Sequence, residues 1–372
     1  MGRIRASHSV RRVTLTGGAL LLVSAGVLGS QQLAPPVFST DVRLVTLPVT
    51  VKDARNAPMG DLNRGDFTIL EEGETREIAV FERRTNRPLS VALMIDSSLS
   101  TAIELRYERR SASHFLSTLL GPDAHESDAA AVYSFSADTE VLSGFTRDHS
   151  KLEKALDRVR PQTGTSVYDA VLLVAKDLSR WDGRRVIVMI TDGGDTTSRY
   201  GFADALRAAH DAEVAIYPLI VLPIRSDAGR NRGGEHALVT LSKNTGGESF
   251  VQHGARDLDV AFAEILRNLR TQYLLGFYPQ GAVGDRTERF RGIEVQVHRE
   301  GAVVLARSGY FADPPAPESK PSRSKDVPVQ VRRLPQPSTA PESGSSKSVG
   351  EEKDARRPPD GQPRPPIVRP EP

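Results

Sequence analysis

The chain has 372 residues, of which 26% are charged, and its formal net charge is +2. A net charge this close to zero indicates no particular partner, and no nucleic acid is expected to bind. The sequence contains no cysteine, which excludes disulfides and thiolate metal sites, and its length is sufficient for two domains.

The first thirty residues have the layout of a secretory signal peptide. Four arginines within the first twelve positions precede an uncharged apolar stretch at 19–29, and small residues follow at Gly29 and Ser30. We therefore predict a signal peptide over 1–30 and an exported protein, periplasmic or secreted. The apolar stretch is shorter than the roughly 20 residues that span a bilayer. Membrane insertion is expected only if this segment is retained as an anchor.

Residues 41–89 have the pattern of a small β segment. Apolar and polar residues alternate over 42–51 and 76–83, and a short strand over 66–74 runs into a glycine. Alternation with a period of two predicts half-buried strands. The tripeptide RGD at 64–66 is interpreted as a turn that leads into the strand FTIL, not as an integrin-binding signal.

Residues 90–271 change to alternating strands and helices. Apolar runs at 90–96 and 184–192 are separated by helical patterns such as 102–120 and 166–180. Continuous runs of valine and isoleucine between amphipathic helices are typical of a parallel sheet that is covered on both faces. The sequence therefore predicts an α/β domain with a doubly wound, mostly parallel, Rossmann-like sheet.

Three further strand-like stretches follow this domain, at 273–279, 289–299 and 302–311. These strands need partners, and so do the strands before residue 90. We predict that a C-terminal β segment over 272–311 pairs with the N-terminal one. The α/β domain is then inserted in, or flanked by, a small β module.

The composition changes again from residue 312 onward. This last part contains 15 of the 25 prolines, which lie among serine, arginine, lysine and glutamate. Such a segment cannot bury enough apolar surface to offset the entropy of ordering it. We predict a disordered, proline-rich tail over 312–372.

Three loops rich in oxygen-bearing side chains follow or precede elements of the predicted sheet. They read DSSLS at 96–100, TGTSVYDA at 163–170 and TDGGDTTS at 191–198. Ligand sites in open parallel sheets lie at the carboxyl ends of the strands. Hard oxygen donors suit Mg²⁺ first, with Mn²⁺ or Ca²⁺ as alternatives. The candidate metal ligands are Asp96, Ser98, Ser100, Thr165 and Asp192.

The three loops, in this order, resemble the metal-ion-dependent adhesion site of von Willebrand factor A domains. The resemblance implies that the hydroxyls ligate the cation, that the aspartates bind it directly or through water, and that an acidic group of a partner protein completes the shell. One departure is Leu99, where the family has glycine. The flanking segments resemble the bacterial von Willebrand factor A-related domain of acidobacterial type, and the resemblance covers about 40–311.

Three kinds of function remain open from the sequence. The first is an exported, non-catalytic adhesion-type module that binds its partner through a cation, with no catalytic and no cofactor-binding residues. The alternative is a metal-dependent hydrolase resembling phosphoesterases, with Asp96 as nucleophile or ligand, or an envelope scaffold with a vestigial metal site. A structural alternative also exists for the motif, since Ser98 or Ser100 could cap a helix that begins near Thr101.

Overall fold

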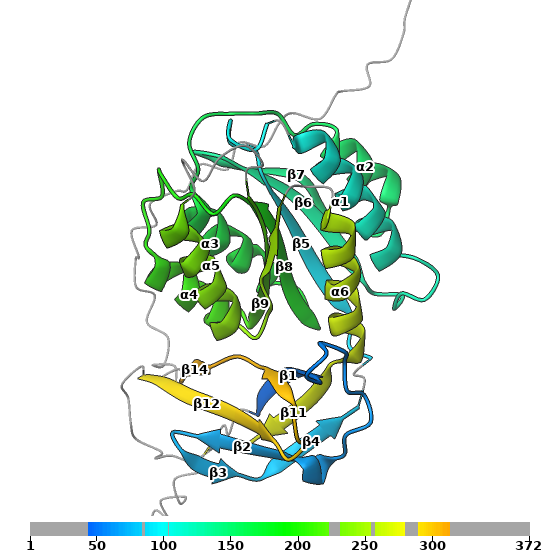
Figure 1. Cartoon of the computed structure of the whole chain (residues 1–372), viewed down its shortest axis with the longest axis vertical. Coiled ribbons are helices and arrows are strands. Elements are labelled where there is room, and N and C mark those ends of the chain that lie inside the picture. The colour runs from blue at the N-terminus through cyan, green and yellow to red at the C-terminus, as the bar shows by residue number, and fades with distance from the viewer. Residues whose placement is uncertain are drawn as a thin grey trace, which may run out of the picture.

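The computed structural model describes residues 44–83, 86–102, 104–222, 231–253, 257–279 and 289–312. These residues form an α/β domain and a β module, which lie one above the other in Figure 1. The predicted signal peptide and the predicted tail beyond Ala312 lie outside the described residues.

The α/β domain is built on a six-stranded sheet with the order β10-β9-β8-β5-β6-β7. Neighbouring strands are parallel except β7, which runs antiparallel to β6. The mostly parallel sheet predicted from the sequence is confirmed. Its strands are β5 (Leu89–Asp96), β6 (Ala129–Phe135), β7 (Thr139–Thr146), β8 (Arg184–Thr191), β9 (Val214–Val221) and β10 (Phe250–Gln252).

The edge strand β7 is a structural feature that the sequence patterns did not indicate. All eight residues of the central strand β5 are buried, whereas β7 has one buried residue and seven that are partly or fully exposed. A strand at the edge of a sheet has no continuous apolar run because one side of it meets solvent. The apolar pattern therefore marked the central strands and not this one.

Helices cover both faces of the sheet, as Figure 1 shows on its two sides. One core layer contains residues of α1 (Leu105–Leu119), α2 (His149–Leu156) and α6 (Leu258–Thr271). The other contains residues of α3 (Val167–Leu178), α4 (Phe202–Asp211) and α5 (Arg232–Asn244). No helix in the described part of the chain is both long and apolar enough to cross a membrane.

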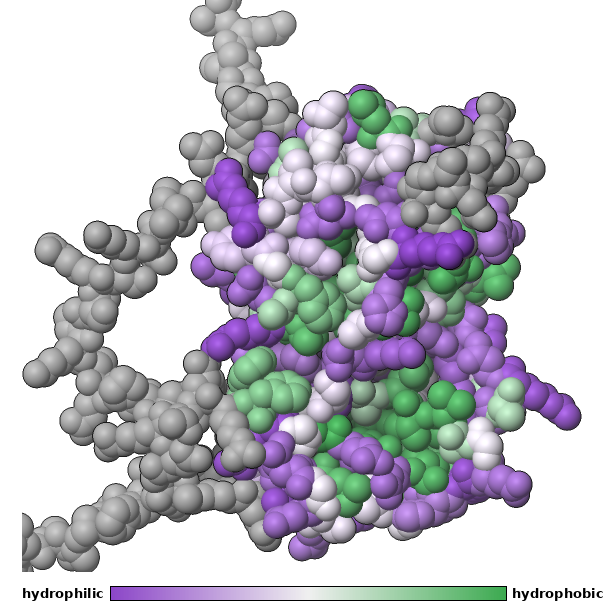
Figure 2. All heavy atoms as spheres, turned by 60° about the vertical axis from the view of Figure 1, so that its left-hand side comes forward, coloured by the Kyte–Doolittle hydropathy of each residue, from purple (hydrophilic) through white to green (hydrophobic). Residues whose placement is uncertain are grey.

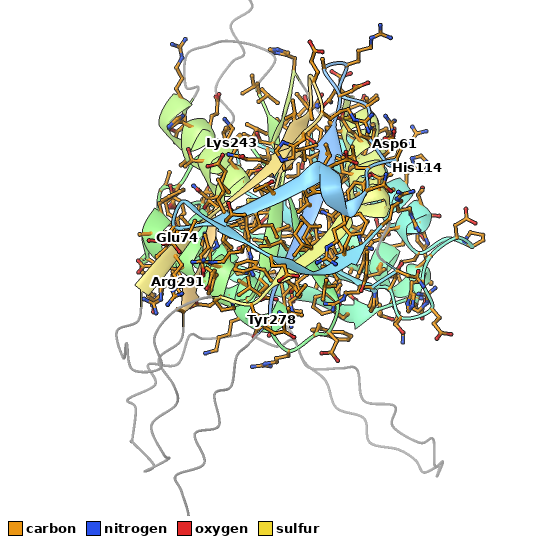
Figure 3. All side chains as sticks on the ribbon, turned by 90° about the horizontal axis from the view of Figure 1, so that it is seen from below. Asp61, Glu74, His114, Lys243, Tyr278 and Arg291 are labelled. Carbon is orange, nitrogen blue, oxygen red and sulfur yellow. The ribbon has the colours of Figure 1, made fainter. Side chains whose placement is uncertain are left out.

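The β module combines segments from before and after the α/β domain. Its two four-stranded sheets have the orders β13-β1-β11-β4 and β14-β12-β2-β3, and the pairs β1 with β11 and β2 with β12 join the two segments. Figure 3 shows this module from below, with Glu74 and Arg291 labelled on its surface. A 3₁₀ turn at Arg64–Asp66 precedes β2. The strands are β1 (Val45–Lys52), β2 (Phe67–Glu71), β3 (Glu74–Arg76), β4 (Ile78–Glu82), β11 (Tyr273–Phe277), β12 (Arg289–Val297), β13 (Val303–Leu305) and β14 (Gly309–Ala312).

The β module contacts the α/β domain at the amino ends of the parallel strands. Lys52 of β1, which is 1% exposed, pairs with Glu248 and with Glu264 of α6. His210 of α4 meets the ring of Phe290 edge-on, with 5.4 Å between the ring centroids. Figure 2 shows a band of hydrophilic residues between the two parts on the face it displays. The oxygen-rich loops lie at the opposite ends of the strands, away from this contact.

Candidate metal centre

The carboxylate of Asp96 is fixed at the carboxyl end of β5. This side chain is fully buried, and its Oδ1 accepts a hydrogen bond of 2.8 Å from the backbone N–H of Ser98. Its Oδ2 accepts one of 2.7 Å from the hydroxyl of Thr191, the last residue of the neighbouring strand β8. Each carboxylate oxygen retains a further lone pair. Asp96 is therefore oriented by two strands at once and keeps acceptor capacity for a cation.

The two serines of the first loop lie beside each other. Their hydroxyl oxygens are 2.9 Å apart, with Ser98 nearly buried and Ser100 exposed. The hydroxyl of Thr101 donates to the carbonyl oxygens of Asp96 and Ser98 and closes the turn. Both serine hydroxyls are thus held at the surface end of the buried aspartate.

Neither serine caps the following helix. Helix α1 begins at Leu105, its N-cap is Glu104, and no side chain makes a capping hydrogen bond there. The alternative explanation of the motif, a helix that begins near Thr101 with Ser98 or Ser100 as its cap, is therefore wrong. Helix capping therefore does not explain why two serines occur in this loop.

Leu99 occupies the position where the resemblance predicts glycine. Its backbone is not among those with a positive φ, so a residue with a Cβ atom fits without strain. Its side chain is 60% exposed. The substitution therefore leaves the loop intact and adds an apolar group beside the two serines.

The second loop is joined to the first and third loops by backbone hydrogen bonds. The N–H of Gln162 donates to the carbonyl of Ser97 at 2.7 Å, and the N–H of Thr196 donates to the carbonyl of Thr165 at 2.8 Å. Gly164 has a φ of +78°, and a Cβ atom there would lie 3.0 Å from the Cβ of Ala137. The tight turn before Thr165 therefore requires glycine.

The third loop carries the second candidate aspartate. Asp192 directly follows β8 and is partly exposed, and its Oδ1 accepts a hydrogen bond of 3.1 Å from the N–H of Gly194. Thr191, which orients Asp96, is its neighbour in the chain. All five predicted residues thus lie on three interconnected loops at one end of the sheet.

The loops are electrostatically unbalanced. Burial, together with the negative charge of Asp192, raises the pKa of Asp96 to about 6, although hydrogen bonds from Thr191 and Ser98 act in the opposite direction. A carboxylate with a raised pKa is one whose negative charge lacks compensation. A bound cation would supply that compensation.

A third carboxylate, which the sequence patterns did not indicate, belongs to this environment. Glu108 lies in the first turn of α1 and is fully buried, and neither of its carboxylate oxygens has a hydrogen-bond partner in the described part of the chain. Burial raises its pKa well above the usual range, and the charges of Asp96, Glu104 and Asp192 add to this effect. A signal was present in the sequence, because Glu108 interrupts the apolar stripe between Leu105 and Ala112.

The residues at this end of the sheet fit a divalent cation. Two carboxylates and three hydroxyls form a donor set made only of oxygen, which Mg²⁺, Mn²⁺ and Ca²⁺ prefer. No group of three His, Cys, Asp or Glu side chains in the described part of the chain is placed to hold a metal ion. The hydroxyls of Ser98, Ser100 and Thr165 are therefore needed to complete a site.

Comparisons with known proteins agree with this fold. Residues 91–194 match the model of the von Willebrand factor type A domain, and this segment contains all five candidate ligands. No curated protein matches the chain significantly. The narrower resemblance to the acidobacterial group stays a prediction.

Solved structures are similar to parts of the chain at low identity. BatB from Bacteroides thetaiotaomicron is 19% identical, with 48% of this chain and 98% of that chain covered and a TM-score of 0.39. The von Willebrand factor domain of the pilus tip protein Mfa5 from Porphyromonas gingivalis is 14% identical, with 54% and 99% covered and a TM-score of 0.40. A von Willebrand factor type A protein from Catenulispora acidiphila is 12% identical, with 74% and 75% covered and a TM-score of 0.41.

Proposed function

Because residues 91–194 form a von Willebrand factor type A domain, we propose that the chain is an exported, non-catalytic protein-binding module. It holds a divalent cation at the three loops, Mg²⁺ first, and through it binds an acidic side chain of a partner protein. The cation ligands are Asp96, Ser98, Ser100, Thr165 and Asp192.

The observation that carries this proposal is the way the three loops are held together. Hydrogen bonds between backbones and side chains fix the loops without using up the candidate donors, and neither serine is needed to cap α1. Metal sites are oriented in this way by residues behind the ligands. Thr191 has this role for Asp96.

The exposure of the loop end favours a partner protein over a small substrate. Ser100 and Leu99 are exposed, so a cation held there can receive a ligand from outside the chain. A carboxylate is the preferred external ligand of a hard cation. At this end of the sheet the two carboxylates with raised pKa values, Asp96 and Glu108, are both fully buried, which favours a binding role over general acid–base catalysis.

The first test is calorimetric titration of the full chain with Mg²⁺, then Mn²⁺ and Ca²⁺. We expect the wild-type protein to bind the cation and Asp96→Ala to lose binding. Asp61→Ala is the matched control, because Asp61 is an exposed carboxylate of the β module that pairs only loosely with Arg299, at 3.7 Å. A wild-type chain that binds none of the three cations would contradict the proposal.

The second test addresses the partner's acidic group. An array of peptides that each contain one aspartate or glutamate is screened with the full chain in Mg²⁺ and in EDTA, beside the same peptides with asparagine or glutamine. Binding should require both the cation and the peptide carboxylate. Binding that persists in EDTA or with the amide peptides would rule out contact through the cation.

A further inference from the structure

Glu108 occupies a position that is otherwise used for packing. The buried face of α1 contains Leu105, Glu108, Ser111, Ala112, Phe115, Leu116 and Leu119. Five of these belong to the hydrophobic layer between the helix and the sheet. Glu108 is fully buried on this same face, one turn into the helix that follows the first loop. Its carboxylate therefore lies inside the domain, close to the carboxyl ends of the strands.

None of the residues that the structure describes is a hydrogen-bond partner of this carboxylate. Both oxygens are buried without a hydrogen bond, and the charged groups that act on them are the carboxylates of Asp96, Glu104 and Asp192. Burying a polar group without a hydrogen bond is costly, and buried charges are normally paired or bound to a metal. An apolar residue would satisfy the helix better at this position.

We propose that Glu108 is a third carboxylate of the cation site, which acts from behind the ligands. This inference rests on the proposed function. Because no group of three acidic or histidine side chains among the described residues is placed to hold an ion, Glu108 does not ligate the cation itself. Its negative charge raises the affinity for a doubly charged ion, which in turn offsets the charges of Asp96, Asp192 and Glu108 together.

A purely structural role makes different predictions. An acidic residue in the first turn of a helix is stabilised by the helix dipole, and removing it for that reason should destabilise the protein with or without metal. If Glu108 is present for the cation, its removal should weaken metal binding while the metal-free protein becomes more stable. The two roles therefore differ in the sign of the effect on the metal-free protein.

The charge is tested with Glu108→Gln, which keeps the size of the side chain. Calorimetric titration of the full chain with Mg²⁺ at pH 8 should give binding that is about 10–100-fold weaker than in the wild type, as for other residues that support metal ligands. Glu104→Gln is the matched control, because Glu104 lies one turn earlier and is only partly buried. Its affinity should remain within about threefold of the wild type.

The cost of burial is tested with Glu108→Leu in thermal unfolding. Without metal this variant should unfold about 3 °C higher than the wild type, and it should lose most of the stabilisation that Mg²⁺ gives the wild type. Unfolding at a lower temperature without metal would overturn the inference. If the wild type binds Mg²⁺ and Glu108→Gln binds it equally tightly, the inference about Glu108 would be overturned, while the proposed function would still stand. A wild type that binds no cation would overturn the proposed function and this inference with it.

Discussion

The β module and the loop end of the α/β domain each bury a glutamate completely, and they treat it in opposite ways. Glu71 of β2 accepts hydrogen bonds from Arg76 at 2.7 Å and from the hydroxyl of Tyr310 at 2.6 Å, and Arg291 lies 3.4 Å away. Neither oxygen of Glu108 has a hydrogen-bond partner among the described residues. The β module compensates its buried charge internally, whereas at the loop end the proposed cation would provide the compensation.

The pKa values follow the same contrast. Burial alone would raise the pKa of Glu71, but hydrogen bonds from Tyr310 and Arg76 and the positive charges of Arg76 and Arg291 outweigh burial and lower it. The same burial raises the pKa of Glu108, and the neighbouring charges are all negative and raise it further. Two fully buried carboxylates thus differ in their partners, and this difference is expected if the loop end is the functional region that we propose.

The largest expected effect comes from breaking the compensation in the β module. Arg76→Met leaves the buried Glu71 without its closest cation, and we expect the free energy of unfolding to fall by about 3–5 kcal/mol. Urea unfolding measures this change. Arg180→Met is the control, since Arg180 is 70% exposed and pairs with Asp177 at 3.7 Å. An equal loss in both variants would contradict the view that Glu71 depends on its partners.

Acidification should weaken the junction between the β module and the α/β domain. Burial and, to a smaller extent, the positive charge of Arg307 lower the pKa of His210 to about 4. Since the folded state disfavours the proton, the free energy of unfolding should be intact above about pH 6.5 and should fall as the pH drops towards about 4. The loss from this group alone should reach about 3 kcal/mol.

The measurement is urea unfolding as a function of pH. His210→Leu, which keeps an apolar contact with Phe290, should flatten the curve in this range, while the exposed His236→Gln should not. Because the pKa of Glu71 is lowered, the stability that this residue contributes is lost in a lower pH range, below the ordinary pKa of 4.5. If the free energy of unfolding of His210→Leu falls with pH as steeply as in the wild type, the loss of stability does not come from His210.

Adding metal should stabilise one region and leave the other unchanged. At a Mg²⁺ concentration of 100 times its dissociation constant, the free energy of unfolding should rise by about 2.7 kcal/mol, and EDTA should reverse this. Hydrogen exchange should slow at Asp96–Ser100, Thr165 and Asp192, and stay the same in β2 and β12. Slower exchange in both regions would show that the cation acts on the whole chain and not on the loops.

The smallest effect is expected at the position that departs from the family pattern. Leu99→Gly keeps all five oxygen donors, so the affinity for Mg²⁺ should remain within about threefold. The added flexibility of the loop should cost about 0.5–1 kcal/mol of stability. Calorimetry and urea unfolding measure the two quantities. A large loss of affinity would mean that the leucine side chain helps to hold the loop in shape.

The sequence by itself determined the α/β domain and the order of its three loops. Continuous apolar runs such as β5 and β8 predict buried parallel strands, and the carboxyl ends of such strands meet at one edge. Asp96 and Asp192 could therefore be assigned to one end of the sheet from the order of residues alone. This works because period and strand direction are local properties of the chain.

Only the tertiary structure decided which neighbours each residue has. It showed that α1 begins at Leu105 and is capped by neither serine, that β7 closes one edge, and that Thr191 orients Asp96. It also showed that Glu71 finds partners on other strands, while Glu108 finds no hydrogen-bond partner among the described residues. The sequence alone does not distinguish Glu71 from Glu108, because the compensation of a buried charge depends on groups that only folding brings together.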